Sequence, residues 1–476
     1  MINLTCIGHD TEFEIGNIIH LFEPYIEGDY SLESRLEEGL AIGRIIKEES
    51  VIFEYEKEVE YAKDPIKLKK SCKLALKEAA YHVLYQLSGK SMPWGILTGI
   101  RPTKIVHEYQ KQGMSEEALR IRLKEVYRIS DEKVNLMMEV AKAEEDILKE
   151  NKEDEISLYI GIPFCPTRCV YCSFTAYSIE AKKNYVESYL DALCKEISFV
   201  AEAKKGNPIR SLYIGGGTPT SLNEAQLERL LKHIKASFNL EDIGEYTIEA
   251  GRPDTITKEK LEIMKAMDVG RISINPQTMN QKTLDAIGRH HTVEDIKEVF
   301  KMARELGHTN INMDIILGLP GEEVEDVKHT LEELKLLSPE NITVHTMAIK
   351  RASKLKEQQD TYELAEAAKI EEMLELSQRA CREMGLSPYY MYRQKNMLGN
   401  FENVGYAKPG YECVYNVEIM EESESIIAAG AGAITKMVYQ NGERIDRIAN
   451  VKNLEDYIGR IDEMIERKRE GFEKYR

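Results

Sequence analysis

The sequence predicts an α/β protein built on a partial (β/α)6 barrel, with an α+β N-terminal domain and a mixed C-terminal extension. Short apolar runs alternate with amphipathic segments between residues 156 and 350, the pattern of parallel strands joined by helices. The alternation occurs six times, fewer than the eight of a closed barrel, so an open barrel is expected. The polar run NKEDE at 151–155 marks a boundary before it. We therefore expect domains at 1–150, 151–350 and 351–476.

The first domain combines strand and helix patterns. The stretch 40–57 holds two β-rich runs separated by the polar KEES. A helical pattern runs from Pro65 to about Leu87, and residues 115–149 are helical again, with Ser115 as the expected N-cap. This mixture predicts an α+β domain.

The barrel strands are expected at 157–163, 211–216, 245–250, 271–276, 312–318 and 342–348. Amphipathic helices are expected between them, near 180–204, 223–237, 258–268, 294–306 and 323–337. Each strand–helix–strand unit implies a parallel pair with a right-handed crossover. Beyond residue 350 we expect a long helix at 361–384, a Gly/Ala strand or turn at 426–438 and a charged helix at 453–470, which together close the site.

Composition excludes several classes of function. The net charge of -18 disfavours binding to nucleic acid or to an anionic membrane surface. No apolar run of ~18 residues is present, so no membrane-spanning helix is expected. The N-terminal stretch MINLTCIGHDTEFEIG lacks the basic and apolar regions of a secretory signal, which predicts a cytoplasmic protein.

Three of the eight cysteines form a cluster directly after the first barrel strand. GIPFCPTRCVYCSF places Cys165, Cys169 and Cys172 at the spacing C-x3-C-x2-C. Three thiolates can hold three irons of a [4Fe-4S] cluster and leave the fourth iron open to a cofactor. Zinc is the rival ligand, but it usually takes four ligands in paired knuckles, and no second knuckle lies nearby. The other five cysteines stand apart and are expected to be small buried hydrophobes.

The cysteine spacing, at the end of the first strand of a partial barrel, is the mark of radical S-adenosylmethionine enzymes. Within that superfamily, YIGIPFCPTRCVYC followed by LYIGGGTPT resembles the oxygen-independent coproporphyrinogen III oxidases and their relatives. NVGYAKPGYE and WGILTGIRPTK look like the HemZ-type coproporphyrinogen dehydrogenase branch. The family resemblance covers about 155–440, and the branch resemblance covers nearly the whole chain.

The resemblance implies a set of cofactor contacts. Cys165, Cys169 and Cys172 would hold the [4Fe-4S] cluster, and the contacts to S-adenosylmethionine would come from Tyr159, Tyr171, Gly216, Gly217, Thr218, Glu249, Gln277, Arg289, Asp314, Ala348 and Ile434. Their chemistry is suitable, because carboxylates accept hydrogen bonds from ribose hydroxyls and ammonium groups, and arginine pairs with carboxylate. No protein residue beyond the cluster and the bound cofactor is expected to be catalytic.

The activity implied is oxidative decarboxylation of two propionates of coproporphyrinogen III to vinyl groups, giving protoporphyrinogen IX. The substrate carries four carboxylates, so cations near the barrel mouth are expected to bind it, and Arg252, Arg351 and Arg393 are the candidates. The partners implied are this small tetrapyrrole and an electron donor such as a flavodoxin or ferredoxin. No nucleic-acid or membrane partner is expected.

Two departures from the family pattern keep other functions open. The oxidases carry a further cysteine two residues after the third ligand, where this chain has Phe174. The related haem-chaperone branch carries a His-Asn pair followed by Tyr-Trp, whereas this chain reads YNVEIM from Tyr415. The alternatives are therefore a protein that binds and delivers haem, and a radical enzyme that acts on another substrate.

Overall fold

The computed structural model describes residues 2–99, 101–152, 154–172, 176–348, 366–394, 397, 400–439 and 444–474. Internal contacts divide the chain into two compact units, Met1–Ala141 and Lys142–Arg476. Each unit is described below by itself. The finer division into three domains stays a prediction.

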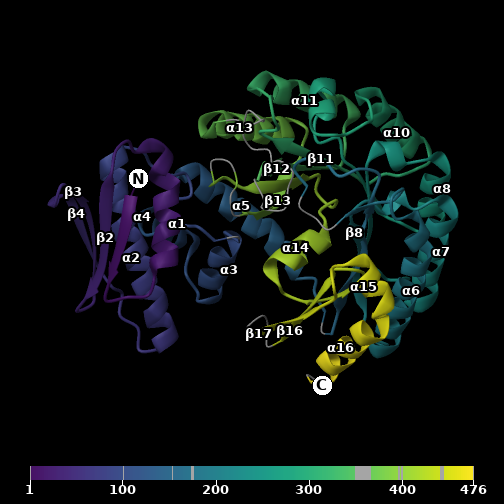
Figure 1. Ribbon diagram of the computed structural model, residues 1–476, viewed down its shortest axis with the longest axis horizontal. Helices are drawn as coiled ribbons and strands as arrows, with labels where there is room; N and C mark the ends of the chain where they lie inside the picture. Colours follow the sequence, from purple (N-terminus) through teal and green to yellow (C-terminus); the bar gives the residue numbers. More distant parts are fainter. Residues whose placement is uncertain are drawn as a thin grey trace. The chain divides into compact units, whose positions relative to one another are not determined.

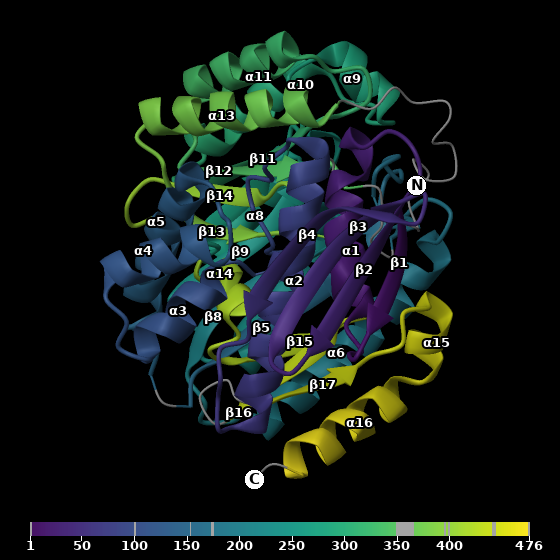
Figure 2. The same cartoon turned by 90° about the vertical axis from the view of Figure 1, so that its left-hand side faces the viewer.

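The first unit is built on a four-stranded sheet in the order β1-β2-β3-β4. Its strands are β1 (Ile2–Ile7), β2 (Tyr30–Glu37), β3 (Leu40–Lys47) and β4 (Ser50–Glu58). Helices α1 (Glu12–Phe22) and α2 (Pro65–Ser88) pack together on one face of the sheet and bury a core that includes Ile18, Phe22 and Leu76 (Figure 2). The two runs around KEES are the antiparallel pair β3–β4, as expected, and α1 is an element that the sequence pattern did not reveal.

Three further helices follow: α3 (Thr103–Lys111), α4 (Glu116–Glu125) and α5 (Asp131–Leu148). The Ser115 hydroxyl accepts a hydrogen bond from the Ala118 backbone N–H at 3.3 Å, which confirms the expected N-cap of α4. Trp94, the single tryptophan, is 1% exposed in the core of the first unit.

The second unit is organised by an eleven-stranded sheet in the order β13-β14-β12-β11-β10-β9-β8-β5-β15-β16-β17. The six expected barrel strands are present as β5 (Ile156–Ile162), β8 (Ile209–Gly216), β9 (Glu245–Gly251), β10 (Arg271–Ile274), β11 (Ile311–Leu317) and β12 (Asn341–Thr346). Neighbouring strands among them pair in parallel, as the alternation predicts. A short pair, β6 (Phe164–Cys165) and β7 (Tyr177–Ser178), follows β5.

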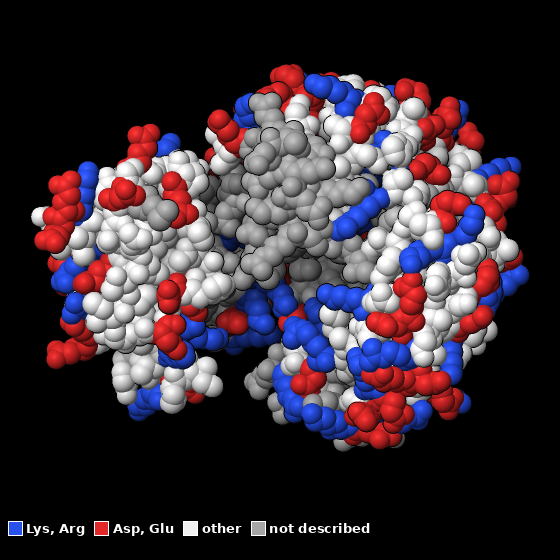
Figure 3. Space-filling view, viewed as in Figure 1, with Lys and Arg blue, Asp and Glu red and all other residues white. Residues whose placement is uncertain are grey.

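Helices cover the outer side of this sheet in a continuous arc (Figure 1). They are α6 (Val186–Ala203), α7 (Glu224–Ser237), α8 (Lys258–Ala266), α10 (Val293–Glu305) and α11 (Val324–Leu337), with the short α9 (Gln281–Ala286) after β10. Acidic and basic side chains are mixed over these outer helices (Figure 3). Among the described helices, none is long and apolar enough to cross a membrane.

The C-terminal segment completes the sheet on both sides. Strand β14 (Asn403–Ala407) pairs antiparallel with β12, and β13 (Ser387–Tyr392) pairs antiparallel with β14 at the edge of the sheet. On the other side, β15 (Ser425–Ala429) pairs in parallel with β5. Antiparallel strands β16 (Ile434–Tyr439) and β17 (Arg444–Ala449) follow. The Gly/Ala stretch therefore supplies a seventh parallel strand, an arrangement that the six-strand expectation lacked.

Four helices accompany these C-terminal strands: α13 (Ala367–Glu383), α14 (Val414–Glu421), α15 (Leu454–Gly459) and α16 (Ile461–Glu473). The expected helix at 361–384 is described from residue 367, and its first residues, 361–365, lie outside the described part of the chain. The expected terminal helix is present as α15 and α16.

Candidate functional site

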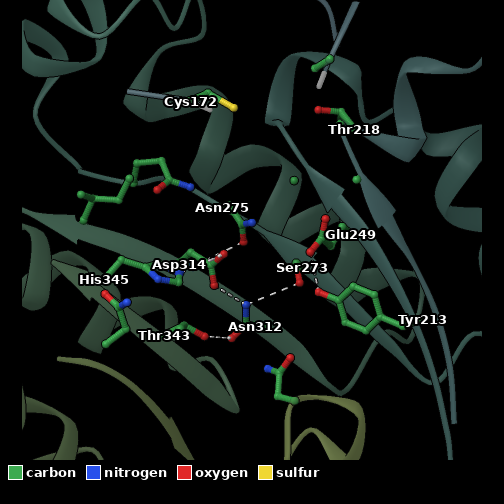
Figure 4. Close-up of a pocket in the computed structure, with 18 of the residues that line it drawn as sticks. Cys172, Tyr213, Thr218, Glu249, Ser273, Asn275, Asn312, Asp314, Thr343 and His345 are labelled. Atoms are coloured by element: carbon green, nitrogen blue, oxygen red, sulfur yellow. Dashed lines mark hydrogen bonds and ion pairs between the residues drawn. The ribbon is translucent and has the colours of Figure 1, made fainter. Parts of the chain in front are cut away.

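A cavity of about 740 Å³ lies inside the barrel and reaches the carboxyl ends of its parallel strands. All the expected cofactor-binding positions line it, together with the three clustered cysteines. Polar side chains at alternate positions of neighbouring strands face it, because successive strand residues point to opposite faces. Those on β10 to β12 include Ser273, Asn312, Asp314, Thr343 and His345 (Figure 4).

The cysteine loop is held against the second barrel strand by backbone hydrogen bonds. The amide of Gly217 donates to the Ile162 carbonyl at 2.7 Å, and that of Thr218 donates to the Phe164 carbonyl at 2.7 Å. The Sγ of Cys165 lies 3.4 Å from the Thr218 hydroxyl. Burial raises the pKa of the Cys165 thiol to about 11, and the nearby Cys172 and Cys169 thiols oppose its ionisation further. A buried thiol that resists ionisation, with two further thiols lining the same cavity, is suited to a cationic iron centre, which compensates the thiolate charge.

Glycines let the cysteine loop approach β8. A Cβ at Gly217 would lie 2.5 Å from the Phe164 carbonyl oxygen and 3.0 Å from the Sγ of Cys165. Gly216 has a φ of 109°, a conformation that favours glycine. The GGGTPT run therefore forms a close-packed turn beside the three cysteines.

Arg252 clamps the same loop from the end of β9. Its Nη1 donates to the hydroxyl and the carbonyl oxygen of Thr167, at 2.8 and 3.1 Å. Its Nε and Nη2 donate to the two carboxylate oxygens of Asp254, at 3.0 and 2.7 Å. Every guanidinium nitrogen of Arg252 thus has a protein partner, and the side chain is 3% exposed.

Glu249 is the acidic group nearest the glycine turn. Its Oε1 accepts a hydrogen bond from the Tyr213 hydroxyl at 2.5 Å. Burial raises the pKa of Glu249 to about 7, and the negative charge of Asp314 contributes to this rise. The hydrogen bond from Tyr213 acts in the opposite direction. The carboxyl group therefore changes its charge near neutral pH.

Asp314 lies across the cavity in a denser network (Figure 4). Its Oδ1 accepts from the Asn312 side chain at 2.7 Å, and its Oδ2 lies 3.7 Å from the Nε2 of His345. Burial alone would raise the pKa of Asp314, but the contacts with His345 and Asn312 outweigh it, and the pKa lies below its usual range. Asp314 and Glu249 therefore differ in charge state at mildly acidic pH.

Arg289 and Gln277 follow β10 in the chain and both line the cavity. The Nη1 of Arg289 donates to the Asn275 carbonyl at 2.6 Å, and its Nη2 lies 3.4 Å from the Tyr171 hydroxyl, so this arginine connects the cysteine loop to β10. Gln277 has a φ of 68° and exchanges backbone hydrogen bonds with Asp314 and Ile316 on β11. Both side chains are buried.

Of the remaining residues that the sequence singled out, some line the cavity and others do not. Ala348 follows β12 and Ile434 begins β16, and both line the cavity, although Ile434 is 44% exposed. Arg393 is absent from the described cavity lining, and its guanidinium donates to the Asn400 carbonyl at 2.7 Å. Arg351 and Phe174 lie outside the described residues.

Several lining residues were not foreseen from the sequence. Tyr213 and Tyr415 stack with their ring centroids 4.5 Å apart, and Tyr159 lies 6.4 Å from Tyr213. His345 and Asn312 support Asp314, and Arg271 lines the cavity at the start of β10. The signal that could have found those on the barrel strands is the alternation of polar residues along otherwise apolar runs, since it marks the inward face.

The partial barrel with three converging cysteines defines a radical S-adenosylmethionine protein. Consistently, residues 159–334 match the family model described as the Radical SAM superfamily. Proteins of this superfamily use a [4Fe-4S] cluster and S-adenosylmethionine, and the donor set described above fits both groups. Cys165, Cys169 and Cys172 would hold the cluster.

Three comparisons with known proteins identify the family within this superfamily to which the chain belongs. The chain is 44% identical over 402 residues to the oxygen-independent coproporphyrinogen-III oxidase-like protein HemZ of Bacillus subtilis, covering 83% of this chain and 80% of that protein. It is 33% identical over 304 residues to the haem chaperone HemW of the same organism, covering 63% and 76%. The solved structure of the Escherichia coli coproporphyrinogen III oxidase HemN aligns with a TM-score of 0.54 and 25% identity, over 68% of this chain and 73% of that chain. The chain belongs to the HemZ-like branch of the oxygen-independent coproporphyrinogen III oxidase family.

Proposed function

We propose that this protein catalyses the oxygen-independent decarboxylation of coproporphyrinogen III propionates to vinyl groups, giving protoporphyrinogen IX. The observation that carries the proposal is one cavity of about 740 Å³ in which the three thiols, the carboxylates Glu249 and Asp314 and a stack of tyrosines come together. That volume lies in the upper part of the range of small-molecule sites. The 44% identity to HemZ, whose name marks it as oxidase-like, supports the same substrate class.

The residues of this chain would bind and orient the two reactants. When bound, the cluster and S-adenosylmethionine would supply an acceptor for a β-hydrogen atom of a propionate; the propionate would then release CO2 and pass one electron to an external one-electron acceptor, which leaves a vinyl group. Glu249 and Asp314 are suited to accept hydrogen bonds from the cofactor's ribose or amino groups, and Arg289 to pair with its carboxylate. The enclosing strands would exclude water from the reacting carbon. An external protein, such as a flavodoxin or ferredoxin, would supply the reducing electron.

A second candidate, haem binding and delivery, is favoured by the 33% identity to HemW. It differs from decarboxylation in an observable way, because a delivered haem keeps its mass. The chain has Tyr415, Asn416 and Val417 in the region where the chaperone branch carries its His-Asn pair, which favours the first candidate.

The deciding experiment is anaerobic incubation of the reconstituted protein with S-adenosylmethionine, a reductant and coproporphyrinogen III, followed by mass analysis. We expect 5′-deoxyadenosine and products that have lost one and two molecules of CO2. Cys169→Ala should abolish both, whereas Cys381→Ala, a buried cysteine outside the cavity lining, should abolish neither. Stoichiometric haem binding without mass loss from the porphyrinogen would contradict the proposal in favour of the second candidate.

A further inference from the structure

Arg271 is a buried cation at the amino end of β10, within the lining of the cavity. The side chain is 3% exposed, and its Nε and Nη1 have no hydrogen-bond partner among the described residues. A guanidinium group stays charged at all relevant pH values, so burying it with unsatisfied donors is unfavourable. The position is therefore suited to an anionic ligand that enters the cavity.

The nearest acidic group does not satisfy these donors. The Nη1 of Arg271 lies 4.0 Å from the Oε2 of Glu245, beyond hydrogen-bond distance. The Glu245 carboxylate accepts instead from the Val414 amide at 2.8 Å and from the Cys413 thiol at 3.2 Å. Glu245 thus offsets part of the charge and leaves the donors of Arg271 available.

The other described arginines and the lysine of the lining have more protein partners, although the Nε of Arg289 also lacks one. Arg252 and Arg289 each donate through both terminal nitrogens to protein atoms. Lys436 contacts Glu422 and the Ile419 carbonyl, both at 3.3 Å, and Arg168 donates to the Cys172 carbonyl at 3.3 Å. Arg271 is the lining cation with the most unused hydrogen-bonding capacity among them.

The position of Arg271 relative to the cysteines indicates which anion would reach it. Arg271 opens β10 and Asn275 directly follows it, and both line the cavity; four residues of extended chain correspond to roughly 13 Å at a strand rise of ~3.3 Å per residue. Asn275 accepts the hydrogen bond of Arg289 near the cysteine loop. A carboxylate at Arg271 would therefore be remote from the reacting one.

Aromatic rings line the cavity together with this arginine. Tyr213 and Tyr415 stack with their ring centroids 4.5 Å apart, and both line the cavity. Tyr213 is close enough to Arg271 to interact with it electrostatically. A flat macrocycle with carboxylates on its edge matches stacked rings beside a guanidinium fork, since arginine binds carboxylates through two parallel hydrogen bonds.

From these observations we infer that Arg271 anchors a non-reacting propionate of the tetrapyrrole and thereby directs another propionate toward the cysteine end of the cavity. The inference rests on the proposed function and names a binding residue for it. Arg271 would act as a specificity-determining residue, because a ligand without the second carboxylate would leave its donors unsatisfied.

The test compares the binding of coproporphyrinogen III with that of its tetramethyl ester, under anaerobic conditions and with the cofactors present. Arg271→Gln should weaken binding of the tetra-acid by roughly 10- to 150-fold, the loss expected for a hydrogen bond to a charged group, and leave ester binding unchanged. Arg304→Gln removes a guanidinium that pairs with Glu340 at 2.7 Å outside the cavity, and it should leave the ratio of acid to ester affinity unchanged.

The outcomes separate this inference from the proposed function. An acid-to-ester ratio in Arg271→Gln equal to that of the wild type would overturn the anchor, whether or not vinyl products form. Wild-type protein that binds the tetra-acid but releases no CO2 would overturn the proposed function and leave the anchor supported. If the Arg271→Gln variant loses its iron, the Arg271→Lys variant is tested in its place. Lysine keeps the positive charge but loses the two-pronged geometry of the guanidinium group, so the ratio of acid to ester affinity should fall at least ~3-fold. An unchanged ratio there would also refute the inference.

Discussion

A buried ion pair joins the C-terminal helix to the barrel, and its removal should destabilise the second unit strongly. Glu196 on α6 and Lys468 on α16 are both 0% exposed, and the Lys468 ammonium lies 2.6 Å from the Oε1 of Glu196. The same carboxylate accepts from Asn450 at 2.8 Å, from the Gly430 amide at 2.9 Å and from the Tyr457 hydroxyl. Gly430 belongs to the turn between β15 and β16, so this network supports one wall of the cavity.

We expect Glu196→Gln to lower the free energy of unfolding by about 3–5 kcal/mol, because it leaves a buried cation without its charge partner. The Asn450 side-chain oxygen, 2.8 Å from the ammonium, and the amide oxygen of the new glutamine could still accept hydrogen bonds from Lys468, but neither carries the compensating negative charge. Lys468→Met should cost less, since the carboxylate keeps three donors. The double variant should lose less than the sum of the two single losses, because the residues share one network.

Urea unfolding followed by circular dichroism would measure these losses. Trp94, buried in the first unit, supplies an internal control, because its fluorescence follows that unit. The loss of unfolding free energy should appear in the transition followed by circular dichroism and not in the transition followed by Trp94 fluorescence. Losses below about 1 kcal/mol in both single variants, or a shift confined to Trp94 fluorescence, would refute the reasoning.

Three further predictions concern the site. Reconstituted protein should hold about four irons and lose them when any clustered cysteine is replaced by alanine, and iron analysis that shows retention in all three variants would contradict the ligand assignment. Because burial raises the pKa of Glu249 to about 7, affinity for S-adenosylmethionine should rise up to ~10-fold between about pH 6 and about pH 8, as the carboxylate forms. Calorimetric titrations across this pH range would measure the rise. In the Glu249→Gln variant the affinity should change little with pH, and an equally steep dependence in the variant would count against the role of Glu249. Arg252→Gln should lower iron retention before it changes the KM for substrate, since the guanidinium holds Thr167; a raised KM at full iron content would instead favour the substrate contact expected from the sequence.

The barrel was predictable because short, largely apolar runs alternate six times with amphipathic segments, the pattern of parallel strands joined by helices. The cysteine loop was equally clear, since its three ligands are close in sequence. A strand or turn was expected where β15 lies, but its parallel pairing with β5 was not, because the pairing of Ser425 with Ile156 is non-local. Arg271 was missed because a charged residue that opens a strand resembles a solvent-facing end, and only the register of β10 turns it inward.

The parallel pairing of β15 with β5 has a consequence for how the chain acquires its cluster. Ser425 is synthesised about 260 residues after Ile162, which at ~5–20 residues per second takes about 13–50 s on the ribosome. During that interval the β5 edge of the sheet, immediately before Cys165, has no neighbour on its β15 side. A nascent chain therefore exposes an unpaired strand edge next to three free thiols, a species prone to aggregation and oxidation. Delivery of iron after release of the finished chain would avoid both hazards.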